Sequence, residues 1–167
     1  SGSYGAERAV EWGKAALDSV GLDRVWLQDV MVPKWVRGLP EVAYIDHGGG
    51  KTTPVPILAL GGSVATPPGG IKAGVVEVQS FDDLAKLGRD KIQCKIVFYN
   101  RPMQPDVIET FRAYGGAVNQ RTKGAEEAAR YGAVGTIVRS MSHKIDDVPH
   151  TGTMQYGDLQ EDLRIPA

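Results

Sequence analysis

The fold is decided by three stretches: residues 91–99 (KIQCKIVFY), residues 123–131 (KGAEEAARY) and residues 134–138 (VGTIV). In the first, every second residue from Ile92 to Phe98 is apolar, the pattern of a half-buried strand. Cys94 lies on that apolar face and is expected to be buried as a small, inert hydrophobe. The second stretch predicts a helix that ends at Gly132, and the third an apolar strand. The strand–helix–strand run predicts a mixed α/β fold.

Two elements and a long loop surround this run. Residues 74–79 predict a strand, and the helix predicted over residues 80–88 begins where the hydroxyl of Ser80 precedes the carboxylate of Asp83, a helix-capping arrangement. A short helix is expected over residues 105–114. Residues 140–164 lack periodicity and are expected to form a surface loop.

The N-terminal part predicts one helix and three strands. Apolar residues recur at helical spacing over residues 6–20, and β-branched and aromatic residues predict strands over residues 25–36, 42–45 and 55–60. The last two are joined by the glycine-rich segment 47–51. The tryptophans are all in this part, and we expect them to cover the helix against the first strand; they are Trp12, Trp26 and Trp35.

The composition excludes several classes of protein. Nineteen basic residues stand against 20 acidic ones, so no nucleic-acid-binding surface is expected. No apolar run approaches the roughly 18 residues of a membrane span. The lone cysteine excludes an internal disulfide framework.

The two ends of the sequence suggest a piece of a longer protein. Residue 1 is Ser and the sequence stops at an Ile-Pro-Ala run, so we expect a piece of a longer protein, although Ala167 could be a natural end.

Two segments resemble binding motifs but favour simpler interpretations. Residues 48–52 (GGGKT) suggest a phosphate loop, yet the glycine required five positions before Gly50 is Ile45, and prolines follow where a helix is needed. A hairpin turn is expected there. The potential metal ligands of the late loop would align on a helix that Pro149 makes unfavourable, so we expect a solvated loop; they are His143, Asp146, Asp147 and His150.

No nucleophile is predicted in this chain. Ser140 and Ser142 lie too close to His143 along the sequence to face it well, and no nucleophile elbow surrounds them. The carboxylate pairs 82–83 and 126–127 lie where helices begin, where the helix dipole favours negative charge. The pair 146–147 stays undecided.

An ordered set of short motifs resembles one protein family. The motifs are WVRG (35–38), ILALGGSV (57–64) leading to TP (66–67), KIVFYN (95–100), GAEEAARYGA (124–133), VRS (138–140) and PHTG (149–152). In this order they resemble the N-terminal part and protease-associated domain of secreted zinc aminopeptidases of the carboxypeptidase Q group.

The resemblance implies an α+β fold with a division near residue 66. Residues 1–66 would be an N-terminal helix with β-strands from the edge of the peptidase domain. Residues 67–167 would be an inserted protease-associated domain, a small β-sandwich or open barrel with flanking helices. Such a domain usually carries no chemistry and acts as a wall over the substrate cleft or as a protein-contact surface.

The resemblance also implies what this chain lacks. The family's site of two zinc ions, with His, Asp and Glu ligands and a glutamate that activates water, lies downstream of the inserted domain. None of the three histidines matches a ligand position. We therefore expect no catalytic residue, metal or cofactor here, no peptidase activity of the chain alone, and a secreted or periplasmic parent.

For the parent enzyme, we expect the loop 139–156 to face the cleft, with peptide substrate and the catalytic domain as partners. Its substrate contacts would be a cation and polar side chains suited to a peptide carboxylate or backbone: Arg139, Ser140, His150 and Tyr156. The alternative is a free-standing α/β module that binds a ligand or a protein, with the glycine-rich segments 48–50 and 61–70 at its mouth. Self-association through the N-terminal strands is a further possibility, because an unpaired edge strand seeks a partner.

Overall fold

The computed structural model describes residues 2–167. The chain divides into two compact units, the first ending at Val36 and the second running from Arg37 to Ala167.

The first unit consists of one helix and an extended segment. Helix α1 (Tyr4–Ser19) confirms the predicted N-terminal helix, and the Ser3 hydroxyl caps it by accepting a hydrogen bond from the Ala6 amide. No residue of α1 is buried. Residues 25–36 belong to no strand, so the strand predicted there is wrong. A strand needs a neighbour to take its backbone hydrogen bonds, and β-propensity does not supply one.

The tryptophans of this unit lie largely in solvent. Trp12 is 74% exposed, Trp26 64% and Trp35 38%. The expectation that they cover the helix against a strand is therefore wrong for this chain, because that strand does not form. The guanidinium of Arg24 lies 5.1 Å from the centre of the Trp26 ring.

The second unit begins with an antiparallel hairpin of β1 (Ala43–Asp46) and β2 (Thr52–Val55). The His47 amide donates to the Lys51 carbonyl at 2.9 Å, and Gly48 and the two glycines after it adopt positive φ. Positive φ is the conformation that glycine accommodates without steric cost. The predicted hairpin turn is thereby confirmed, while the predicted strand over residues 55–60 is restricted to its first residue.

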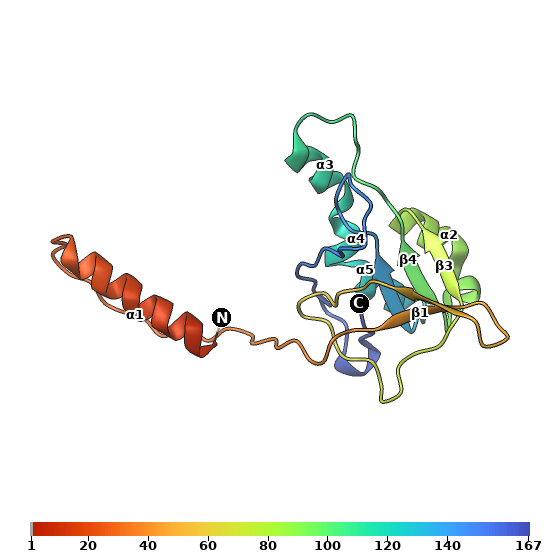
Figure 1. Ribbon diagram of the computed structural model, residues 1–167, viewed down its shortest axis with the longest axis horizontal. Helices are drawn as coiled ribbons and strands as arrows, with labels where there is room; N and C mark the ends of the chain where they lie inside the picture. The colour runs from red at the N-terminus through yellow and green to blue at the C-terminus, as the bar shows by residue number, and fades with distance from the viewer. Residues whose placement is uncertain (1) are drawn as a thin grey trace. The chain divides into compact units, whose positions relative to one another are not determined.

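A three-stranded parallel sheet forms the centre of this unit, in the order β3–β4–β5 (Figure 1). Its strands are β3 (Val75–Val78), β4 (Ile96–Tyr99) and β5 (Gly135–Val138). Helix α2 (Phe81–Ile92) connects β3 to β4, and three helices connect β4 to β5: α3 (Thr110–Ala117), α4 (Asn119–Thr122) and α5 (Gly124–Arg130). The predicted mixed fold with flanking helices is confirmed.

The core lies between this sheet and its helices. Its largest fully buried side chains are Tyr99, Leu84, Ile92 and Val97. The predicted face of the central strand is wrong, since Val97 and Tyr99 are the buried residues of β4 while Ile96 and Phe98 are half-buried. The register changes at Cys94, which has φ +59° and is exposed, so the expectation of a buried thiol is also wrong.

Residues after β5 form a long irregular segment, as predicted, with one short 3₁₀ turn, η1 (Glu161–Leu163). The end of this segment returns to the start of the unit's core. The Leu60 amide donates to the Ala167 carbonyl at 3.0 Å, and the Ala167 amide donates to the Ser63 hydroxyl at 2.9 Å. Residues 60–63 and the last residues therefore lie side by side. No helix within residues 2–167 has the length and apolarity to cross a membrane.

Candidate functional site

Three polar side chains form a chain of hydrogen bonds across the parallel sheet. Asn100, which follows β4, donates through Nδ2 to Oε1 of Glu77 in β3 at 2.8 Å. Arg139, which follows β5, donates through Nη1 to Oδ1 of Asn100 at 3.0 Å. Two of these residues lie at the carboxyl ends of strands, the edge where open α/β sheets commonly bind ligands.

Arg139 is the predicted contact residue best placed on this edge. Its amide donates to the Tyr99 carbonyl at 2.9 Å, so its backbone continues the pairing of β5 with β4. Its Nε atom is buried and has no hydrogen-bond partner among residues 2–167. Because this N–H is closed to solvent, it is not available to an acceptor that approaches from outside.

The structure brings Ser140 and His150 together beside Arg139. The His150 amide donates to the Ser140 hydroxyl at 3.1 Å and closes the loop between them. The hydroxyl of the next residue, Thr151, donates to the Ala59 carbonyl at 2.9 Å. The predicted contact residues Arg139, Ser140 and His150 thus share one edge of the unit.

Tyr156 lies elsewhere. Its side chain is buried, and its hydroxyl donates to the Ile165 carbonyl at 2.6 Å while accepting from the Val64 amide at 3.0 Å. Its ring also carries the Arg164 guanidinium at 5.4 Å from the ring centre. The hydroxyl is therefore used inside the fold, where it joins the C-terminal segment to residue 64.

The acidic and histidine residues of the late loop do not gather. Within the described residues 2–167, no group of three or more His, Cys, Asp and Glu side chains is arranged to hold a metal ion. Asp146 instead accepts a hydrogen bond from the Val148 amide at 3.0 Å and pairs with Lys144 at 3.3 Å. This carboxylate stabilises its own turn.

Arg101 and Gln120 are structural residues that the sequence analysis missed. Gln120 accepts from the Arg101 amide at 3.1 Å and donates to the Arg101 carbonyl at 2.8 Å. The Arg101 guanidinium donates to the carbonyls of Gln79 at 2.7 Å and Gly116 at 2.9 Å. Their partners are 15 to 22 positions away in sequence, so only the position of Arg101 shortly after a strand could have indicated a role.

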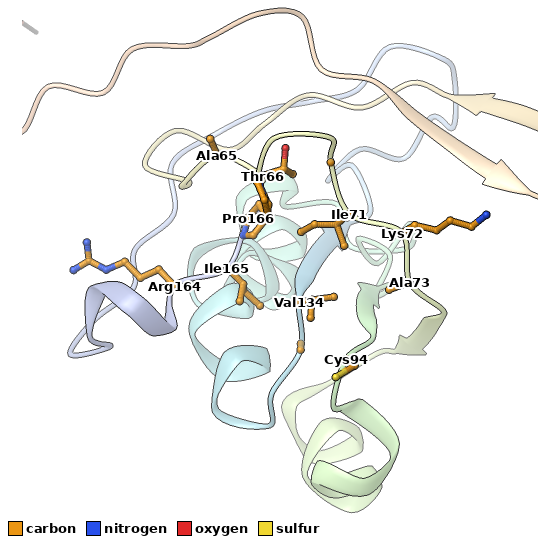
Figure 2. Close-up of a pocket in the computed structure, with 13 residues that line it drawn as sticks. Ala65, Thr66, Ile71, Lys72, Ala73, Cys94, Val134, Arg164, Ile165 and Pro166 are labelled. Atoms are coloured by element: carbon orange, nitrogen blue, oxygen red, sulfur yellow. The ribbon is translucent and has the colours of Figure 1, made fainter.

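The opposite edge of the sheet carries an open groove of about 690 Å³ (Figure 2). Its apolar lining includes Ile71, Val134 and Ile165. Two cations in its lining already have acidic partners: Lys72 pairs with Asp46, and Arg164 lies 3.6 Å from Glu161. Because residues 73, 94 and 134 precede β3, β4 and β5, the groove lies at the amino ends of the strands, away from Arg139.

Comparison with known proteins confirms the resemblance inferred from the motifs. The chain is 38% identical over 156 residues to bovine (Bos taurus) carboxypeptidase Q, covering 93% of this chain and 30% of that protein. It is 36% identical over 158 residues to human carboxypeptidase Q, covering 95% of this chain and 31% of that protein. The chain thus spans about a third of the length of these curated relatives. No protein-family model matches it.

A solved structure shares the fold. A peptidase M28 precursor from Shewanella amazonensis superposes with a TM-score of 0.84 at 34% sequence identity. The match covers 99% of this chain and 36% of that chain. The fold described above is therefore found within a longer peptidase M28 chain.

Proposed function

We propose that this chain is a non-catalytic, protease-associated part of a longer, secreted zinc-dependent exopeptidase, in which it shapes access of peptide substrates. The observation that carries the proposal is the asymmetric coverage of the match. Carboxypeptidase Q aligns with 93–95% of this chain but with only 30–31% of its own length. Export to the periplasm or the exterior is part of the proposal and is supported by the resemblance.

Within residues 2–167, the acidic and histidine side chains form no group suited to a metal ion. In the proposal, the zinc ligands and the glutamate that activates water belong to the remainder of the longer protein. The contribution of this chain is then binding and positioning.

The hydrogen bonds between Leu60, Ser63 and Ala167 support an inserted domain. An insertion must leave its host domain and return to it at neighbouring points, and these residues hold the two ends of the unit's core together. We accordingly keep the division near residue 66 as part of the proposal, with residues 1–66 belonging to the peptidase domain and 67–167 to the insert.

The proposed contact surface is the edge that carries Arg139, Ser140 and His150. A guanidinium offers paired donors that match a peptide carboxylate, and a neighbouring hydroxyl suits a peptide backbone. The hydrogen bonds from Arg139 to Asn100 and from Asn100 to Glu77, which fix the guanidinium at the carboxyl ends of the strands, support this assignment. Tyr156 would act from inside the fold, by joining residue 64 to the C-terminal segment.

The experiment is Arg139→Ala in the longer protein, with Arg139→Lys as the matched control. We expect Arg139→Ala to raise KM for peptides with a free terminal carboxylate by about tenfold, the effect of losing one charge-assisted hydrogen bond. Arg139→Lys should recover part of this loss, and zinc content should not change. Unchanged kinetics in both variants would remove this edge from the substrate site.

A second candidate is a free-standing module that binds a ligand or a protein, and the apolar groove in Figure 2 favours it. The groove is bordered by residues 65–73, which overlap the predicted glycine-rich mouth at 61–70. The coding sequence after residue 167 distinguishes the two candidates. His-x-Asp and Glu-Glu motifs there would favour the peptidase, and a stop codon would favour the module.

A further inference from the structure

The connection between β4 and α4 carries an apolar projection. The chain leaves the sheet after Tyr99 and returns through α3, which stands away from the sheet in Figure 1. Ile108 is 98% exposed and Phe111, in the first turn of α3, is 91% exposed. We call these two side chains the α3 tip. Two large apolar side chains exposed three residues apart make this projection a candidate interaction surface.

The rest of the projection is packed. Met103, Ala113 and Ala117 form a small buried cluster, and Val107, Tyr114 and Met141 pack against it. The inner face of α3 is therefore satisfied by its own contacts. Ile108 and Phe111 take no part in this cluster and are exposed to solvent, although the projection around them is packed.

The projection is also fixed to the sheet. Arg101 donates to the Gly116 carbonyl at the end of α3 and to the Gln79 carbonyl after β3. Gln120, which is 2% exposed, holds the backbone of Arg101 through both its amide and its carbonyl. These bonds hold the base of the projection in one place, which lowers the entropy cost of docking the tip.

We propose that the α3 tip docks into an apolar recess on the part of the longer protein that lies outside residues 1–167. This inference rests on the proposed function. The solved peptidase M28 chain is matched over only 36% of its length, so most of such a protein lies outside the matched region and can cover the tip. Met141, two residues after Arg139, packs against the buried cluster beneath the tip, so the loop that begins at the proposed contact edge contacts the base of the projection. Docking the tip would seat this edge beside the cleft.

The charged residues next to the α3 tip indicate which side chains should line the border of the recess. Asp106, Glu109 and Arg112 are exposed around the tip. Charges at the rim of an apolar contact contribute to orientation more than to affinity. The recess should therefore be apolar at its centre and polar at its border.

A photo-crosslinking experiment in the longer protein tests the proposal directly. Phe111→p-benzoylphenylalanine is irradiated, digested and mapped by mass spectrometry, with Arg112→p-benzoylphenylalanine as the neighbouring control. We expect an intrachain cross-link from position 111 to a segment outside residues 1–167, and weaker labelling from position 112. A cross-link to a second copy, or none beyond the control, would overturn the proposal.

A stability comparison separates this proposal from the proposed function. The double variant Ile108→Ser/Phe111→Ser should leave the Tm of the 167-residue chain within about 1 °C, because both side chains are already exposed there. In the longer protein it should lower Tm by several degrees, and Arg112→Ser should not. Equal losses in both chains would overturn docking. Peptidase activity of the longer protein is measured separately, so a protein without activity but with the cross-link would reject only the proposed function.

Discussion

Tyr99 is the largest fully buried side chain in the core of the second unit. Its ring packs edge-to-face with Phe81 at 5.9 Å between ring centres, and its hydroxyl donates to the Gly124 carbonyl at 2.9 Å. Burial, with a smaller contribution from Glu127, raises the pKa of Tyr99 above its ordinary value. Gly124 leaves no room for a side chain, because a Cβ there would lie 2.8 Å from the Tyr99 ring. The ring and the start of α5 therefore determine each other.

Tyr99→Phe should lower the free energy of unfolding by about 1–2 kcal/mol, because it removes the hydroxyl and leaves the buried Gly124 carbonyl without this donor. Urea denaturation followed by circular dichroism measures the change. Tyr44→Phe, at an exposed position of β1, is the matched control and should have little effect. Equal stability of Tyr99→Phe and the unchanged chain would show that this hydrogen bond is not needed.

At the scale of elements, the hydrogen bonds that begin helix α2 also lower the pKa of an aspartate. The Ser80 hydroxyl accepts from the Asp83 amide at 3.0 Å, and the Asp83 carboxylate accepts from the Gln79 amide at 3.2 Å. Hydrogen bonding to Ser80, followed by that of the Gln79 amide, holds the pKa of Asp83 below its ordinary value. The same residues thus fix the end of β3 and the start of α2.

This lowered pKa predicts a pH dependence of stability. Below the ordinary aspartate range the unfolded chain binds more protons at this position than the folded chain, so stability increases with pH there. The contribution of Asp83 is fully present above its unfolded pKa and is lost as the pH falls through its folded pKa. Asp83→Asn should flatten the fall in stability between about pH 5 and pH 3, measured by urea denaturation. Asp82→Asn, at an exposed neighbour, is the charge-matched control; equal flattening by both variants would contradict this assignment.

Elements with local signals could be predicted from the sequence. The capping Ser80 and the glycines after His47 act through neighbouring residues, and the start of α2 and the hairpin turn were predicted correctly. The end of α2 was predicted at Gly88, where the backbone is non-helical, but the helix continues to Ile92 and the following strand begins only at Ile96. Residues 25–36 have strand propensity, but strand formation depends on a pairing partner, and none of the described residues 2–167 pairs with them. The face of β4 was wrong because one residue with positive φ, Cys94, changes the register. Such a conformation leaves no periodic signal.

The candidate site was predictable only in part. Arg139, Ser140 and His150 were identified from a resemblance and residue chemistry, and the structure brings these three to one edge. The links through Asn100 and Glu77 could not be predicted, since they join residues 23 to 39 positions apart. Tyr156 was selected for its hydroxyl, which the fold uses internally.

At the scale of the whole molecule, the two units differ in how they bury apolar surface. The second has a core of its own, whereas helix α1 of the first has no buried residue. Large apolar side chains of the first unit are exposed, among them Trp12, Val30 and Met31. In the longer protein we propose that the peptidase domain covers them.

The isolated chain should therefore self-associate through residues 4–36. An exposed apolar segment with unpaired backbone favours association between copies. Static light scattering over a hundredfold range of concentration should show a rising apparent mass, and a chain of residues 37–167 should show a constant one. Strictly monomeric behaviour of the 167-residue chain at the highest concentration would contradict this prediction.

The central claim is that this polypeptide supplies structure and substrate contacts while the hydrolytic centre lies elsewhere in the longer protein. The most direct measurement is zinc content by mass spectrometry together with dipeptide turnover, for the purified 167-residue chain and the longer protein side by side. We expect bound zinc and turnover in the longer protein and neither in the 167-residue chain. Stoichiometric zinc and dipeptide hydrolysis by the 167-residue chain alone would contradict it.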